Sequence, residues 1–219
     1  MPIKLASLIL TILFFGIFIV ASRFSYSHRF NTPYSMKNMF PFEVNYEGTF
    51  AKNFYGNSAM VLMVFAAIFF FVFFDQKFEN GFFITMMIVG IIGVICIGAL
   101  SFVPMKLYRL HFVFAVLLFG VTLVLSSLIV IACFRNWQNY DYKSSFIAFL
   151  IGSITTLMVF ILIMNPKLTK PIKGIEEKQE DGTVIMKRPK IIWLAYSEWL
   201  LFFIFLIDMV ALLFETMHF

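Results

Sequence analysis

Six long apolar stretches dominate this sequence of 219 residues and limit what it can fold into. A helix needs about 20 apolar residues to cross the hydrocarbon core of a bilayer, at a rise of about 1.5 Å per residue. Each stretch meets that length, and charged residues, asparagine or proline interrupt the chain between them. We therefore predict an all-α fold, a six-helix transmembrane bundle, with helices at residues 3–22, 57–74, 82–103, 110–133, 146–164 and 191–214.

The composition agrees with a polytopic integral membrane protein that forms a single membrane domain over residues 1–219. The chain is 61% hydrophobic and 13% charged, whereas soluble domains are about 45–50% apolar and about 25% charged. This excludes a disordered chain, nucleic-acid binding as the main activity and a large soluble catalytic domain. Cys96 and Cys133 lie in apolar stretches without a CxxC partner, so we interpret them as small core residues.

Two connections between the predicted helices are long enough to form structure of their own. Residues 23–56 are polar but rich in aromatic residues, which favour the headgroup layer. We expect an interfacial aromatic cap there, lying on the membrane face. Residues 165–190 are charged, and Asp181-Gly182 within them is a good two-residue turn between Glu176–Glu180 and Thr183–Lys187. We expect a small exposed β-hairpin in this connection.

The basic residues predict an orientation and a class of partner. The first, third and fifth connections hold 13 of the 17 Lys and Arg residues. The positive-inside rule then places these connections in the cytoplasm and both termini outside. Basic connections also attract anionic headgroups, so we expect membrane lipids as partners, other membrane protein subunits as an alternative, and no nucleic acid. The residues expected to contact lipid or a partner are Lys167, Lys170, Lys173, Lys187, Arg188, Lys190 and Trp199.

Ionisable residues inside the apolar stretches are the candidates for chemistry, because burying a charge in hydrocarbon is costly. The candidates are His111, Glu198 and Asp208, and Glu215 lies on nearly the same side of the last helix as Asp208. We interpret His111 first as a structural hydrogen bonder. Glu198 is either an interfacial carboxylate or a functional group.

Asp208 also has two interpretations. It is either a proton relay or a protonated acid that pairs with a hydroxyl, for which the candidates are Thr155, Thr156 and Ser126. A different pattern marks the third predicted helix, where Gly90, Gly93 and Gly98 form a face of small residues. That face indicates close helix–helix contact rather than a pore.

The motifs of common catalytic and metal sites are missing from the sequence. The three histidines lie in separate segments, so there is no HExxH motif, and no GxSxG, P-loop or GxGxxG motif occurs. A lipid-modifying site built from His111, Glu198 and Asp208 would lack an obvious nucleophile and the further histidines that a zinc ion needs. We expect no metal and no cofactor.

Short motifs in the third, fourth and sixth helices resemble the DRAM/Sfk-type family of six-helix membrane proteins, and a prokaryotic six-helix family of unknown function shows a similar pattern. The motifs are Ser101-Phe-Val-Pro104, His111-Phe-Val-Phe-Ala115 with Phe119, and Ser197-Glu198-Trp199. The resemblance implies a compact bundle without a cofactor, linked to membrane lipid organisation or trafficking, with His111, Glu198 and Trp199 at signature positions. Two features depart from the family: the fifth connection is longer, and the family's termini are usually cytoplasmic.

The sequence as a whole favours a non-enzymatic polytopic membrane protein with a lipid-associated scaffolding or regulatory role. One alternative is an accessory subunit of a larger membrane complex, because the 31 phenylalanines form broad apolar faces. Another is an intramembrane lipid-modifying enzyme using His111, Glu198 and Asp208, which requires these side chains to lie within about 10 Å of one another. A proton-coupled carrier centred on Asp208 ranks last.

Overall fold

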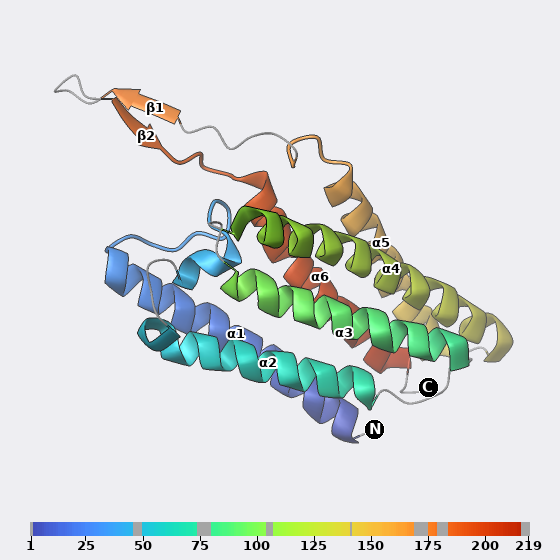
Figure 1. Ribbon diagram of the computed structural model, residues 1–219. Coiled ribbons are helices and arrows are strands. Elements are labelled where there is room, and N and C mark those ends of the chain that lie inside the picture. Colours follow the sequence, from blue (N-terminus) through green and yellow to red (C-terminus); the bar gives the residue numbers. More distant parts are fainter. Residues whose placement is uncertain are drawn as a thin grey trace.

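The computed structural model describes residues 2–45, 50–73, 80–103, 107–140, 142–168, 175–178 and 184–215. Within these ranges six helices are long and apolar enough to cross a membrane, which confirms the predicted all-α six-helix bundle. They are α1 (Pro2–Phe30), α2 (Phe54–Val72), α3 (Asn80–Phe102), α4 (Tyr108–Tyr140), α5 (Lys143–Ile163) and α6 (Trp193–Glu215). Successive helices run up and down the bundle, so the start of α1 and the end of α6 lie at the same end of it (Figure 1).

Two helices run farther than the apolar stretches that predict them. The helix α1 continues from Ser22 to Phe30, and α4 continues beyond Cys133 to Tyr140. Both extensions are polar, and polar residues do not end a helix that has left the hydrocarbon. The end of α1 is instead set by Asn31, whose φ of 53° lies in the left-handed region. Asparagine tolerates that conformation, which commonly terminates helices.

The helix α6 forms the centre of the bundle. Inside the protein, 67% of its apolar segment is buried, against 28% for α5 and 33% for α1 and α4. Large aromatic side chains fill the space around it, including Phe18, Phe71, Trp199 and Phe205, all at most 2% exposed. The glycine face of α3 admits two of these rings, because Gly90 lies against Phe71 and Gly93 against Phe205. This confirms the predicted close helix–helix contact.

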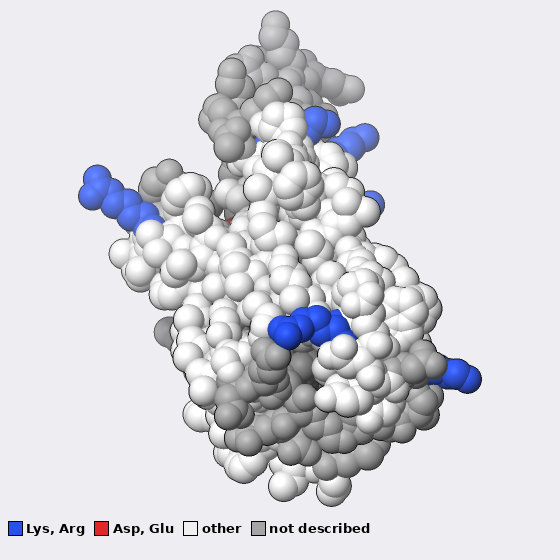
Figure 2. All heavy atoms as spheres, turned by 90° about the vertical axis from the view of Figure 1, so that its right-hand side faces the viewer, with Lys and Arg blue, Asp and Glu red and all other residues white. Residues whose placement is uncertain are grey.

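The outer surface of the bundle is apolar. On α1, α4 and α5 the exposed side chains at mid-span are mostly Leu, Ile, Val and Phe. Figure 2 shows one face of the molecule, on which uncharged residues dominate and Lys and Arg are few. Such a surface suits contact with lipid acyl chains.

The first long connection folds onto the end of the bundle. We call residues 31–45 the cap; they include the short 3-10 helix η1 (Pro41–Asn45), and a second one, η2 (Phe50–Asn53), leads into α2. Tyr34, Phe40 and Phe42 of the cap are at most 4% exposed, whereas Phe24 and Tyr55 are 74% and 78% exposed. The aromatic residues of this connection are therefore divided between the protein interior and the outer surface, and they do not all lie in the headgroup layer.

The second long connection carries two strands, β1 (Ile175–Lys178) and β2 (Val184–Lys187), which pair antiparallel. Figure 1 shows this hairpin extending beyond the capped end of the bundle. The predicted turn at Asp181-Gly182 lies outside the described residues. The register pairs Lys178 with Val184, whereas a two-residue turn at that site would continue into a pairing of Lys178 with Ile185.

Candidate functional site

A buried histidine–glutamate pair lies beneath the cap. His111 in the first turns of α4 and Glu198 in α6 are 1% and 0% exposed. The Nε2 atom of His111 lies 3.2 Å from Oε1 of Glu198, and its Nδ1 atom lies 3.0 Å from the carbonyl oxygen of Val103 at the end of α3. The imidazole therefore joins three helices at the capped end.

The partners of His111 determine how its protons are placed. A carbonyl oxygen only accepts hydrogen bonds, so Nδ1 carries a hydrogen and donates it to Val103. One further proton lies between Nε2 and Oε1, on either the imidazole or the carboxyl group. Because both ring nitrogens are engaged, His111 offers no free nitrogen to a metal ion or a substrate. This arrangement supports the structural interpretation of His111.

The cap closes over this pair with aromatic rings. Phe40 and Phe42 meet the His111 ring edge to face, with centroid distances of 5.8 Å and 5.1 Å. The indole Nε1 of Trp199 donates a hydrogen bond of 3.0 Å to the carbonyl oxygen of Met39. Trp199 was expected to contact lipid, but it is 2% exposed and holds the cap in place.

Tyr34 stabilises the cap through one hydrogen bond inside the cap and one ring contact with α6. Its hydroxyl donates a hydrogen bond of 2.7 Å to the carbonyl oxygen of Phe40, and its ring meets that of Trp199 edge to face at 6.1 Å. Burial raises the pKa of the Tyr34 phenol well above its usual value, so the hydroxyl keeps the proton that it donates.

Asp208 lies deeper in the bundle and joins α6 to two other helices. Its two carboxyl oxygens each lie 2.6 Å from a hydroxyl oxygen, that of Ser126 in α4 and that of Thr155 in α5. The predicted pairing with a hydroxyl is therefore confirmed for both. Thr156 donates its hydrogen bond to the carbonyl oxygen of Gly152 instead.

The close contacts around Asp208 outnumber the hydrogens that the two hydroxyl groups can donate. The Ser126 hydroxyl also lies 2.9 Å from the carbonyl oxygen of Thr122, and the Thr155 hydroxyl 3.0 Å from that of Gly152. Four close contacts thus share two hydroxyl hydrogens, because carbonyl and carboxylate oxygens only accept. An ionised Asp208 satisfies two of the contacts, and a protonated Asp208 satisfies three.

The three candidate residues do not form one site. Asp208 lies ten residues after Glu198 on the same helix, which corresponds to about 15 Å along its axis. Glu215 is farther still and accepts a hydrogen bond of 2.7 Å from Asn136 of α4. The carboxyl groups of α6 therefore contact α4 at three separate depths in the bundle. The lipid-modifying interpretation requires His111, Glu198 and Asp208 to lie close together, and they do not.

The basic residues expected to contact lipid have different positions. Lys167 and Lys190 are exposed, and Arg188 is 45% exposed while its guanidinium pairs with Glu43 of the cap. Lys170 and Lys173 lie outside the described residues, and Lys187 lies on β2, where the structure describes only the backbone. The pairing with Glu43 was missed, because nothing in the sequence connects two residues so far apart.

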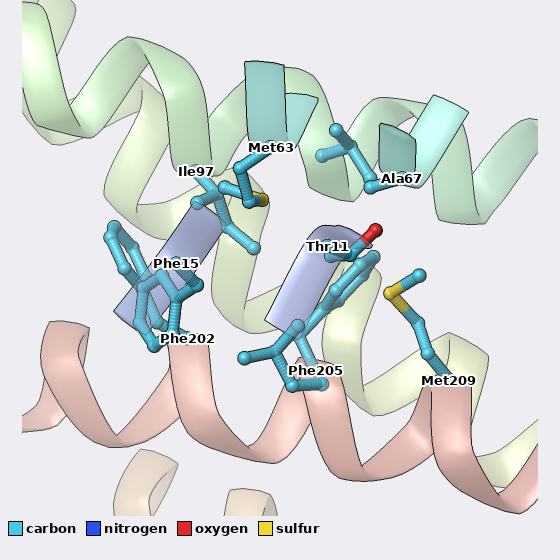
Figure 3. A pocket seen from close by; sticks show the side chains of 10 residues that line it. Thr11, Phe15, Met63, Ala67, Ile97, Phe202, Phe205 and Met209 are labelled. Carbon is cyan, nitrogen blue, oxygen red and sulfur yellow. The ribbon is translucent and has the colours of Figure 1, made fainter. Parts of the chain in front are cut away.

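A small cavity lies between α1, α2, α3 and α6 near the middle of the bundle (Figure 3). Its space corresponds to roughly one water molecule. Thr11 is the one polar residue that lines it, and its hydroxyl donates to the carbonyl oxygen of Ser7 at 2.7 Å. The remaining lining residues are Phe15, Met63, Ala67, Val94, Ile97, Phe202, Phe205, Leu206 and Met209. This cavity is too small and too apolar for a substrate.

Among the described residues, no group of three or more His, Cys, Asp or Glu side chains is placed to hold a metal ion. Comparison with family models, with curated proteins and with solved structures found no match to this chain. The resemblance to the DRAM/Sfk-type family therefore stays a prediction.

Proposed function

We propose that this protein is a non-enzymatic multi-pass membrane protein whose capped end binds anionic lipid headgroups, in a scaffolding or regulatory role. The observation that carries the proposal is that acidic residues are buried whereas most basic residues are exposed. The acidic residues whose side chains the structure describes are all buried, each at most 7% exposed as a residue. They are Glu43, Glu198, Asp208 and Glu215.

The basic side chains show the opposite distribution. Most of those described are exposed at the capped end of the bundle. Three lie at the other end: Arg135 and Lys143 are exposed there, and Lys4 is buried. Each exposed cation near an anionic membrane surface contributes about 1 kcal/mol to binding. The exposed residues at the capped end are Arg23, Lys37, Lys52, Arg109, Lys167, Arg188 and Lys190.

The interior of the bundle supports a non-enzymatic role. Both ring nitrogens of His111 have protein partners, and the carboxyl group of Asp208 is held between two hydroxyls. The Ser126 and Thr155 hydroxyls also lie within hydrogen-bond distance of backbone carbonyl oxygens of their own helices. With the basic connections in the cytoplasm, the capped end would meet the leaflet that carries most anionic lipid.

The test uses the full-length protein, purified gently from its own membrane and analysed by mass spectrometry for bound lipids and proteins. We expect enrichment of anionic lipid over zwitterionic lipid, reduced by high salt. A variant with Lys37, Lys52, Arg109 and Lys167 changed to Gln should lose this enrichment. The matched control changes Arg135 and Lys143 to Gln at the opposite end and should keep it.

Two results would overturn the proposal. Equal retention of anionic and zwitterionic lipid by the unaltered protein would remove the headgroup interaction. Stoichiometric protein partners without lipid enrichment would instead identify an accessory subunit of a larger complex, and would direct attention to the exposed phenylalanines of α2, Phe65 and Phe69.

A further inference from the structure

Arg188 links the two long connections of the chain. It follows β2 directly and precedes α6, and its Nη1 and Nη2 atoms lie 2.6 Å and 2.8 Å from the two carboxylate oxygens of Glu43. Its Nη1 atom also donates to the carbonyl oxygen of Asn38 at 3.2 Å. A bidentate ion pair thereby fixes the base of the hairpin to the cap.

Backbone contacts continue this junction on both sides of Arg188. The side-chain amide of Asn38 donates to the carbonyl oxygen of Pro189 at 3.3 Å. The backbone N–H of Ile192 donates to the carbonyl oxygen of Lys37 at 2.9 Å. We call residues 37–43 together with residues 188–192 the seam. The seam joins segments about 150 positions apart in the sequence.

Two N–H groups of the Arg188 guanidinium are not used by the contacts to the cap. A guanidinium carries five N–H groups, and the three contacts above use both Nη1 hydrogens and the Nη2 hydrogen that faces Nη1. The Nε hydrogen and the second Nη2 hydrogen have no partner among the described residues, and they share the adjacent edge. Such an edge matches two oxygens of a phosphate group. The side chain is 45% exposed, so this edge is within reach of a ligand.

The charges around the seam favour an anion. Arg29 donates to the carbonyl oxygen of Val44 at 3.3 Å, one residue after Glu43, so a second guanidinium lies near the seam. Lys37 and Lys190 are exposed on the two sides of the seam. Hydrogen bonding to Glu43 raises the pKa of Arg188 above its already high value, so the guanidinium stays charged at any physiological pH.

The residues beside the seam are of the types found at the depth of lipid headgroups. Ile191, next to Lys190, is 43% exposed, and Trp193 begins the apolar helix α6 two residues later. The Nζ atom of Lys167 lies 5.0 Å from the centre of the Trp193 ring. Tryptophan and lysine together mark the boundary between acyl chains and headgroups.

We propose that the seam, centred on the open edge of Arg188, binds the phosphate of an anionic lipid headgroup and so holds the hairpin, the cap and the membrane together. This rests on the proposed function and deepens it, because it assigns lipid binding to one geometric site. A general attraction of the capped end would depend on the number of charges alone, whereas this site depends on the shape of the guanidinium.

The test measures the retention of phosphatidylglycerol relative to phosphatidylcholine by the full-length protein in native mass spectrometry. Arg188→Lys keeps the charge but removes the parallel N–H groups, so we expect about a fivefold loss of phosphatidylglycerol preference, the ratio that corresponds to about 1 kcal/mol. The matched control is Arg135→Lys, an exposed arginine at the opposite end of the bundle, which should leave the preference unchanged.

A second variant covers the case in which Arg188→Lys fails to fold. Glu43→Gln keeps a hydrogen-bond acceptor for Arg188 but removes the competing negative charge, so the phosphatidylglycerol preference should rise. Inorganic phosphate at equal phosphate concentration serves as a second probe. Displacement of the lipid by inorganic phosphate at that concentration would overturn the assignment to a lipid headgroup.

The outcomes separate the two proposals. If the unaltered protein shows no preference for phosphatidylglycerol, the proposed function itself fails. If the preference is present but Arg188→Lys and Arg135→Lys change it equally, or Glu43→Gln lowers it, the seam is not the site and only the general attraction stands.

Discussion

The ring of Phe205 in α6 packs directly on Gly93 in α3, at a position where any side chain would overlap the ring. One turn earlier on α3, Gly90 lies in the same way against Phe71 of α2. The two rings meet each other at a centroid distance of 5.9 Å. The packing of these two rings between α2, α3 and α6 therefore depends on two glycines of α3.

Gly93→Ala should destabilise the protein by about 1–3 kcal/mol, because the added methyl group forces the Phe205 ring or the helix to move. The measurement is equilibrium unfolding in denaturing detergent, followed by circular dichroism. Gly120→Ala is the matched control, since a methyl group at Gly120 in α4 would meet nothing within 4 Å. Equal losses for both variants would contradict the packing role of Gly93.

The number and approximate places of the helices could be predicted, because hydrocarbon demands long apolar stretches and few other structures satisfy the backbone. The ends of the helices could not be predicted from the apolar stretches in the same way. The residues of α1 after Ser22 are polar and remain helical until Asn31 adopts a left-handed conformation. That conformation depends on local backbone geometry, which composition does not reveal.

The site was predictable only in part. His111, Glu198 and Asp208 were identified because ionisable groups are rare in hydrocarbon, but their grouping depends on which helices are neighbours and at what depth. The separation of Glu198 from Asp208 follows from helical rise. The burial of Trp199 does not follow from sequence, because it depends on the Met39 carbonyl oxygen of a cap 160 positions away.

Asp208→Asn should preserve the fold better than Asp208→Ala. An asparagine amide both donates and accepts, so it can replace a protonated acid between Ser126 and Thr155. The alanine variant loses both interhelical hydrogen bonds, each worth about 0.6–1.7 kcal/mol in membranes. Unfolding in denaturing detergent compares the two variants. Equal destabilisation would show that a carboxylate charge is required there and would favour the relay interpretation.

Cysteine labelling should reveal which side of the membrane the capped end faces. The native Cys96 and Cys133 are 1% and 0% exposed, so they give little background. We expect a membrane-impermeant maleimide to label Lys143→Cys in intact cells, and Lys190→Cys after permeabilisation. The reverse pattern would place the termini in the cytoplasm, as in the family that the sequence resembles.

The His111–Glu198 pair should behave as a unit in a double-mutant cycle. His111→Ala and Glu198→Ala should each cost about 3–5 kcal/mol, because each leaves a buried polar partner without its hydrogen bond. The double variant should lose less than the two losses added together, by about 0.5–3 kcal/mol. Ser127→Ala, on the same helix as His111, is the control for a hydroxyl that bonds only within its own helix.

Glu198→Gln distinguishes a structural pair from a reactive one. With Nδ1 donating to Val103, a neutral His111 can accept a hydrogen bond at Nε2 from the glutamine amide, so the fold should be nearly unchanged. If the pair is structural, the lipid retention of this variant should equal that of the unaltered protein. Loss of lipid retention in a fully folded Glu198→Gln protein would show that the acidic proton itself is used, and would reopen the enzymatic interpretation for this pair alone.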